Sequence, residues 1–280
     1  MPASSCSSSL RLRCSNSLPV IATHIATQEK RPPQRGLVTD TAGGDAPAGR
    51  LYIGAQRADT IYPVNPRKPT AVPLWHWDQP VAPLRDLLRR GGILAIPTES
   101  SYGLGADPRS PAGVEAIYRI KGREAGKALP VVVAGSEQLA DLGVDPNLDI
   151  VERLCELWPA PLTAVLPTRK PLPAATGERT LAVRVPAHEG LRKLLAELGH
   201  GLTATSANRS GGEPVLDPAG AAELLAGEDA VVVDGGVLPG GPPSTLVAIE
   251  GEGLVVLRTG RFPTERLMET FARSTGETKE

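Results

Sequence analysis

The stretch ILAIPTESSYGLG, residues 93–105, is the part of the chain from which the rest can be interpreted. Its first residues are apolar and predict a short buried strand, which ends in a proline, several hydroxyl and carboxyl side chains and two glycines. Polar groups at a strand end with a glycine-rich exit are typical of a ligand-binding loop, and an ordinary turn is the alternative. The segment from Pro97 to Gly105 is therefore the first candidate for a functional site.

Predicted helices and strands alternate on both sides of this segment. Residues 81–90 predict a helix that ends at Gly91-Gly92, and Ser110-Pro111 begins another helix over residues 111–120. The remaining predicted strands are 129–134, 162–167, 180–185, 201–206, 230–233, 244–249 and 254–258, and the remaining predicted helices are 136–142, 148–157, 188–198, 217–225 and 264–272. This alternation predicts an α/β or mixed-sheet fold in one domain, residues 80–275.

The residues before this domain have a different composition. Residues 1–50 are expected to be a disordered leader and linker, because residues 30–50 are rich in proline and glycine. The first 20 residues hold seven serines, two arginines and no acid, which resembles an organellar transit peptide. We favour the alternative, a disordered tail or an early start codon. Residues 51–79 are an extension to which the sequence assigns no role.

Charge and composition exclude several classes of function. The 280 residues carry a net charge of -1, which divides into +4 for residues 1–79 (9 basic, 5 acidic) and -5 for residues 80–280 (21 basic, 26 acidic). This acidic main body and a content of only nine aromatic residues argue against a nucleic-acid platform. Three cysteines and four scattered histidines give no metal-ligand spacing, so no protein metal site and a reducing, cytoplasmic location are expected. No apolar run approaches the ~18 residues of a membrane span.

A second candidate segment is KGREAGK, residues 121–127. Lys121 and Arg123 would project to one side of an extended chain, and Lys127 precedes a predicted strand. Three cations beside one acid, in an acidic domain, suggest a phosphate-binding cluster; a solvated helix end with favourable dipole pairing is the alternative. The stretch is one residue short of a P-loop and lacks its hydroxyl group, so a P-loop is excluded.

Further polar groups accompany the later strands. Ser206 and Asn208 share an i,i+2 spacing ahead of two glycines, where an Asx or ST turn is the alternative to a ligand site. Ser244 begins one predicted strand and Arg258 ends another, whereas Arg184 lies inside an apolar strand and must either pair with an acid or face an anionic ligand. Open α/β sheets bind ligands at strand ends, so these groups predict a nucleotide site that works by positioning and charge neutralisation.

These motifs, taken in order, resemble the YrdC-like threonylcarbamoyl-AMP synthase family. Residues 97–105 resemble its PTxTxYGLG signature, residues 121–123 its KxR element and residues 206–208 its SxN element. Further matching blocks are WPAPLT (158–163), LAVRVP (181–186), DGG (234–236), ST (244–245) and LRTG (257–260). The resemblance covers residues 80 to about 265, and the short remainder is similar to the short form of the family, which lacks an extra C-terminal domain.

The resemblance implies a nucleotidyltransferase that condenses L-threonine, bicarbonate and ATP to threonylcarbamoyl-AMP and pyrophosphate. The product would supply a tRNA threonylcarbamoyl transferase machinery that makes N6-threonylcarbamoyladenosine, and weak binding of tRNA itself is a further expectation. The implied fold is a twisted mixed β-sheet flanked by helices, with a deep basic cleft. The implied cofactor is Mg²⁺, held mainly by the ATP phosphates.

The resemblance also implies a role for individual residues. The catalytic residues around ATP would be Lys121, Arg123, Ser206 and Asn208. Other ATP contacts would be made by Lys127, Thr180, Pro214 and Arg258. Contacts to threonine would be made by Ser100, Val132, Arg184, Ala204 and Ser244.

Two departures from the family pattern keep other functions open. Ser100 replaces a threonine of the signature and keeps the hydroxyl group, whereas Val132 stands where many members have a threonine-contacting histidine. One alternative is therefore a YrdC-like paralogue, or a carbamoyl-adenylate former that does not use threonine. Another is a module that binds structured RNA, against which the acidic body argues.

Overall fold

The computed structural model describes residues 71–123, 126–251 and 253–272, and within them the strands form two mixed sheets. The predicted leader and most of the extension lie outside the described residues. In order across the first sheet, the strands are β1 (Leu74–Trp75), β9 (Ala230–Val233), β2 (Ile93–Pro97), β3 (Tyr102–Gly105) and β8 (Thr205–Ser206). Those of the second sheet are β11 (Gly253–Arg258), β10 (Thr245–Glu250), β5 (Leu162–Pro167), β6 (Thr180–Arg184), β4 (Val131–Val132) and β7 (Leu202–Thr203).

Both sheets contain parallel and antiparallel pairs. In the first sheet β1, β9 and β2 are parallel neighbours, and β3 and β8 are added antiparallel. In the second sheet β10 is parallel to β5 and β6 is parallel to β4, while the other pairs are antiparallel. The predicted mixed α/β fold is confirmed, with its strands divided between two sheets.

The segment 202–206 joins the two sheets. Its first part, β7, pairs with β4 in the second sheet, and its last part, β8, pairs with β3 in the first. Ala204 lies at the crossing, where its N–H donates to the carbonyl of Pro130 over 2.8 Å. The single strand predicted over residues 201–206 is therefore two short strands, because each half finds its backbone partners in a different sheet.

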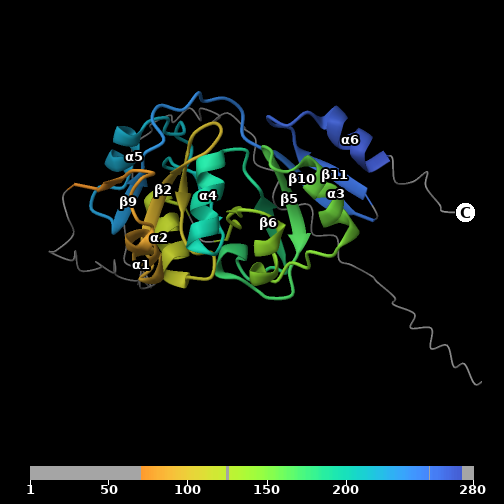
Figure 1. Ribbon diagram of the computed structural model, residues 1–280, viewed down its shortest axis with the longest axis horizontal. Helices are drawn as coiled ribbons and strands as arrows, with labels where there is room; N and C mark the ends of the chain where they lie inside the picture. The colour runs from red at the N-terminus through yellow and green to blue at the C-terminus, as the bar shows by residue number, and fades with distance from the viewer. Residues whose placement is uncertain (1–70, 124–125, 252, 273–280) are drawn as a thin grey trace, which may run out of the picture.

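Helices lie against both sheets and between them (Figure 1). Helices α1 (Ala82–Arg89), α2 (Pro111–Lys121) and α5 (Pro218–Leu224) accompany the first sheet, α3 (Asp149–Leu157) and α6 (Thr264–Ala272) lie beside the second, and α4 (Glu189–Leu198) lies in the middle of the view. Helix α2 begins as its sequence predicts: the Ser110 hydroxyl accepts the N–H of Gly113, 3.2 Å away. It ends at Gly122, whose φ of 59° places it in the left-handed region that favours glycine.

Two local predictions are wrong. Residues 136–142, expected as a helix, form two separate 3-10 turns, Ser136–Gln138 and Ala140–Leu142, because left-handed Gly143 ends the segment before a longer helix forms. Tyr102–Gly105, expected as part of a loop, is strand β3 and forms a hairpin with β2. Its two glycines allow close packing: a Cβ on Gly103 would lie 3.4 Å from the Thr205 carbonyl oxygen.

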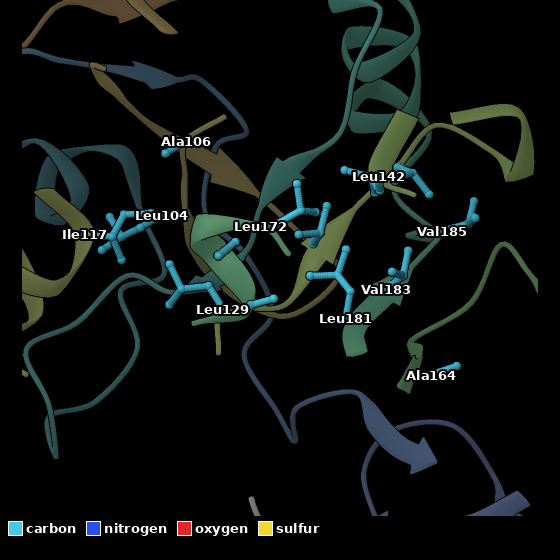
Figure 2. Packing of buried hydrophobic residues seen from close by; sticks show 14 of the residues in the cluster. Leu104, Ala106, Ile117, Leu129, Leu142, Ala164, Leu172, Leu181, Val183 and Val185 are labelled. Carbon is cyan, nitrogen blue, oxygen red and sulfur yellow. The ribbon is translucent and has the colours of Figure 1, made fainter. Parts of the chain in front are cut away.

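The hydrophobic core connects the two halves of the molecule. Its larger cluster extends from Leu104 and Ile117, beside the first sheet, to Leu181 and Val183 in the second (Figure 2). A smaller cluster lies on the other side of β2 and includes Trp75, Leu84, Val132 and Leu191. Every residue of β2 is buried, which explains its uninterrupted apolar sequence. The strand that introduces the candidate loop is therefore fixed on both faces.

The described part of the N-terminal extension belongs to this fold. Residues Leu74–Trp75 add β1 to the edge of the first sheet, and the Trp75 side chain is 6% exposed in the smaller cluster. Trp77 packs edge-to-face on Trp75 and stacks on His188, with ring centroids 5.7 and 5.9 Å apart. Residues 71–79 thus support the start of α4. Among the described residues, no helix is long and apolar enough to cross a membrane.

Stability should depend on the protonation state of His188. Its Nδ1 accepts the N–H of Leu191 and so caps α4, which requires the neutral ring. Burial is the largest effect and lowers the pKa of His188, the charge of Glu99 raises it, and that of Arg192 lowers it. The unfolded chain therefore takes up a proton near pH 6.5, before the folded protein does, and the free energy of unfolding should fall as the pH drops below that value.

The measurement is the thermal midpoint at pH 7.5 and at pH 5.5, for the wild type and His188→Asn. Asparagine caps helices without titrating in this range, so the loss of stability between the two pH values should be smaller in the variant. An equal loss in both proteins would contradict the assignment.

Candidate functional site

Three of the four predicted catalytic residues meet at the C-terminus of α2. The Lys121 ammonium group donates hydrogen bonds to the Ser206 carbonyl, the Asn208 carbonyl and Asn208 Oδ1, at 2.6, 3.2 and 2.8 Å. The Ser206 hydroxyl also donates to Asn208 Oδ1, over 2.7 Å. The N–H of Ser210 returns a bond of 2.8 Å to the Lys121 carbonyl. The KxR and SxN elements, which are distant in the sequence, thus form one hydrogen-bonded network.

The local backbone explains this arrangement. Ser206 is placed by β8, which is hydrogen-bonded to β3 opposite Gly103. The chain then turns back at Gly211, whose φ is 82°, and the Asn208 amide donates to the Gly212 carbonyl. This internal bond fixes the amide plane of Asn208, so its oxygen points at Lys121. A backbone turn, closed by the Gly212 N–H and the Arg209 carbonyl at 2.9 Å, lies in this segment beside the site residues.

Arg123 brings a second cation to the network. Its Nε is buried and has no hydrogen-bond partner among the described residues, and burial lowers the pKa of Arg123. Lys121 is 4% exposed, and burial, followed by the charge of Arg123, lowers the pKa of Lys121 to about 8. Buried cations without a carboxylate partner are costly unless an anion neutralises them. The electrostatics therefore favour a bound polyanion at this position.

A second group of predicted residues gathers around Arg184. The Arg184 guanidinium forms an ion pair of 2.8 Å with Glu99, which answers the question posed by an arginine in an apolar strand. The Ser244 hydroxyl is 2.8 Å from that of Thr163, and Arg258 donates to the Ser244 carbonyl over 3.0 Å. Desolvation and the nearby charge of Arg184 lower the pKa of Arg258. Two guanidinium groups and a hydroxyl group thus form an anion-binding arrangement.

The two groups are linked through the hairpin β2–β3. Its connection, residues 98–101, carries Glu99 and Ser100, and its second strand pairs with Ser206. The Ser100 carbonyl accepts the N–H of Gly240 over 2.8 Å, so this connection is also tied to the loop that leads to Ser244. The predicted threonine contacts are therefore adjacent to the predicted ATP contacts along one hairpin.

Val132 and Ala204 occupy backbone positions next to this site. Val132 pairs in register with Arg184, but its side chain is 1% exposed and packs into the smaller core cluster. Ala204 lies at the crossing between the sheets. Contacts of these two residues with threonine remain predictions, and for Val132 the backbone is the part that lies beside Arg184.

Three other predicted residues lie at the margins. Thr180 begins β6 and Arg184 ends it, so the two are separated by about 13 Å of strand. Lys127 is exposed, with its carbonyl bonded to the Tyr118 hydroxyl at 2.8 Å, and Pro214 is exposed beyond the Asn208 turn. Their ATP contacts stay predictions. So does the deep basic cleft: the two described cavities, of about 310 and 270 Å³, lie beside Trp77 and beside Arg169.

Sequence reasoning missed the roles of two residues. Glu99 was part of the first candidate loop but received no function, and Thr163, whose hydroxyl is 2.8 Å from that of Ser244, received none either. Arg261, a candidate ligand-binding cation from its place near a strand end, donates to the Glu99 carbonyl over 2.6 Å. One signal was present: an arginine in an apolar strand requires an acid, and Glu99 is the acid in the loop that follows the central strand.

Comparisons with known proteins identify the family of this chain. A family model, Sua5_yciO_yrdC, described as "Telomere recombination", matches residues 86–260. The chain therefore belongs to the Sua5/YciO/YrdC family.

Individual members of the family are similar to this chain to different degrees. The threonylcarbamoyl-AMP synthase of Thiobacillus denitrificans is 40% identical over 166 residues, which cover 59% of this chain and 88% of the relative. The crystal structure of P. abyssi Sua5 complexed with L-threonine superimposes with a TM-score of 0.64 at 29% identity, covering 75% of this chain and 65% of that protein. E. coli YciO, at 24% identity, shares the fold with a TM-score of 0.60, covering 71% of this chain and 99% of that one.

Proposed function

We propose that this protein condenses L-threonine, bicarbonate and ATP to threonylcarbamoyl-AMP and pyrophosphate. The observation that carries the proposal is the pairing of two sites along one hairpin. Lys121 and Arg123 form a cationic site beside Ser206 and Asn208, and no carboxylate among the described residues forms an ion pair with either cation. Arg184, Arg258 and Ser244 form a second anion site next to Ser100. A reaction that joins a triphosphate to an amino acid needs both.

The first site would hold the triphosphate of ATP. This group carries about four negative charges, which the buried Lys121 and the neighbouring Arg123 would offset. Ser206 and Asn208 add uncharged donors that fix its orientation. Arg258, from the second site, would neutralise charge that develops as pyrophosphate leaves. Pre-organisation by the hydrogen bonds to Lys121 supports this role, because the cation does not have to be ordered on binding.

The second site would hold threonine through its carboxylate. The guanidinium of Arg184 would pair with the carboxylate. The hydroxyl groups of Ser100 and Ser244 would form hydrogen bonds with the polar groups of the amino acid. The amine of threonine joins bicarbonate with loss of water, and an oxygen of the resulting carbamate attacks the α-phosphorus of ATP. The bond to pyrophosphate breaks, and threonylcarbamoyl-AMP remains. Holding both substrates on one hairpin supplies the alignment that this displacement requires.

Mg²⁺ belongs to the proposal as a companion of ATP. The groups around Lys121 are cations, amides and hydroxyls, and the described residues hold no group of three or more His, Cys, Asp or Glu that could form a metal cage. The donors of the site therefore fit a metal held by the phosphates and water, where it would neutralise charge on the leaving group. Lys121 and Arg123 would bind the phosphates and not the metal.

The proposal extends to partners and location. The mixed anhydride product is short-lived in water, so a downstream tRNA threonylcarbamoyl transferase machinery would consume it, in the cytoplasm. Weak binding of tRNA would occur through the same cations. Support for these points comes from the proposed reaction and the reducing location expected from the cysteine content.

The test is pyrophosphate release by the purified full-length chain with ATP, Mg²⁺, bicarbonate and L-threonine. Release is expected to require all of the substrates and to fall to background when threonine is replaced by valine, which lacks the hydroxyl group. Release that ignores threonine would favour a carbamoyl-adenylate former that does not use it. Tight tRNA binding without turnover would favour the RNA-binding module.

A further inference from the structure

Glu99 accepts three hydrogen bonds from residues at or just after the ends of β6 and β11. One carboxylate oxygen accepts from Arg184 over 2.8 Å, and the other accepts the N–H of Ala187 over 2.6 Å. Its carbonyl oxygen accepts from Arg261, also over 2.6 Å. The residue itself belongs to the hairpin of the first sheet, so these three bonds connect the two sheets beside Ser100.

The ion pair is shielded from water on both sides. The side chains of Arg184 and Glu99 are 11% and 12% exposed, respectively. In such surroundings an ion pair is strongly directional, and removal of one partner leaves the other charge uncompensated. By contrast, most ion pairs among the described residues involve at least one side chain that is more than two-fifths exposed.

A second cation explains why Arg184 needs this partner. Arg258 lies close enough for the charge of Arg184 to lower the pKa of Arg258. Two neighbouring guanidinium groups repel each other. The carboxylate of Glu99, 2.8 Å from Arg184 Nη1, offsets this repulsion. Only Nη1 of Arg184 has a hydrogen bond to Glu99, and the remaining nitrogens have no described hydrogen bond.

We propose that Glu99 is a positioning residue that holds Arg184 beside Arg258, with its free nitrogens directed at the carboxylate of the amino-acid substrate. Glu99 does not touch the substrate in this scheme. It acts through Arg184, and its bond to the Ala187 N–H keeps the carboxylate itself in place. The inference rests on the proposed function, because that function supplies the carboxylate.

The variant that tests this is Glu99→Gln, which keeps the size of the side chain and an oxygen for the Ala187 N–H. The apparent KM for L-threonine should rise about tenfold, because a charge-assisted hydrogen bond is lost and Arg184 moves away from Arg258. The KM for ATP and kcat at saturating threonine should each stay within about twofold. A fall in the threonine KM would overturn the proposal, since Glu99 would then chiefly repel the substrate.

Two further variants distinguish a positioning role of Glu99 from a general effect on stability. Asp107→Asn removes another partly buried carboxylate, 18% exposed and paired with Arg109 at 2.9 Å, away from the site; it should leave both KM values unchanged. In an Arg184→Ala background, Glu99→Gln should raise the threonine KM no further, because its effect passes through Arg184. Additive effects would mean that Glu99 acts by another route.

A structural readout distinguishes this proposal from the proposed function. If the wild type releases no pyrophosphate in response to threonine, the proposed function fails. The position of Arg184 in crystal structures of the wild type and Glu99→Gln still tests the role of Glu99. A displaced guanidinium in the variant supports positioning, and an unmoved one overturns it.

Discussion

Replacement of Arg123 by alanine should lower turnover about a thousandfold or more and leave the thermal midpoint unchanged or slightly higher. The buried Nε of Arg123 has no described partner, so the folded protein loses no hydrogen bond there. The charge of Arg123 also disfavours the neighbouring Lys121 ammonium, so its removal relieves repulsion in the free enzyme. Neutralisation of transferring phosphates by an arginine contributes effects of about 10³ or more, and this loss should dominate the kinetics.

Arg119→Ala is the matched control for this variant. It removes a guanidinium group from the same helix, one that forms an ion pair of 2.6 Å with Glu228 at the surface. Turnover should be retained, with a small decrease in stability at most. The measurements are pyrophosphate release and thermal unfolding. A marked drop in the midpoint of Arg123→Ala would show that Arg123 serves the fold and not a ligand.

Lys121→Met should be equally inactive, but it should also lower stability. The Lys121 ammonium group holds both the Ser206 and the Asn208 segments, and methionine fills the space without supplying a donor. Loss of these bonds, offset in part by removal of a buried charge, should lower the thermal midpoint by about 2–6 °C. Turnover should fall about a thousandfold because the phosphates lose a cation and Asn208 loses its orientation.

The control is Lys193→Met on α4, where the lysine is 72% exposed and paired with Glu189. It should be active and unchanged in midpoint within about 1 °C. If Lys121→Met binds ATP as tightly as the wild type, with a fluorescent ATP analogue as the probe, the triphosphate is not held here and the site assignment fails.

The two variants together distinguish two kinds of catalytic cation. Lys121 is buried and hydrogen-bonded to two segments of the fold, whereas the Nε of Arg123 has no partner among the described residues. Burial lowers the pKa of both groups, but only Lys121 is predicted to stabilise the folded protein before substrate binds. A difference in stability between two equally inactive variants would therefore show which cation the fold itself uses.

Much of this arrangement could be predicted from the sequence because it depends on local chemistry. The N-cap at Ser110 and the apolar run before Pro97 define their elements without distant partners. The grouping of Lys121 with Asn208 followed from the family resemblance, and the structure brings these residues within hydrogen-bonding distance. The predicted contacts with substrates themselves remain to be tested.

The remaining features depend on partners that are distant in the sequence, so they could not be predicted from local sequence patterns. Gly103 and Gly105 indicate a loop when considered locally, yet they form a strand because Ile96 and Thr205 lie close on either side. The division of residues 202–206 between two sheets depends on pairing with β3 and β4, which lie much earlier in the sequence. The pairing of Glu99 with Arg184 joins residues 85 apart in the sequence.

The two separations differ: Ser206 pairs with Gly103 across 103 positions, and Thr203 pairs with Val131 across 72 positions.

The strand shared between the sheets limits how this enzyme can open. A hinge that separated the two sheets would have to pivot at Ala204, break the hydrogen bond from its N–H to the Pro130 carbonyl, and divide the larger hydrophobic cluster, which contains residues of both sheets. We therefore expect the two halves to move as one body. Substrate entry and product exit would then occur through movement of the loops and side chains around the hairpin, and not by separation of the two sheets.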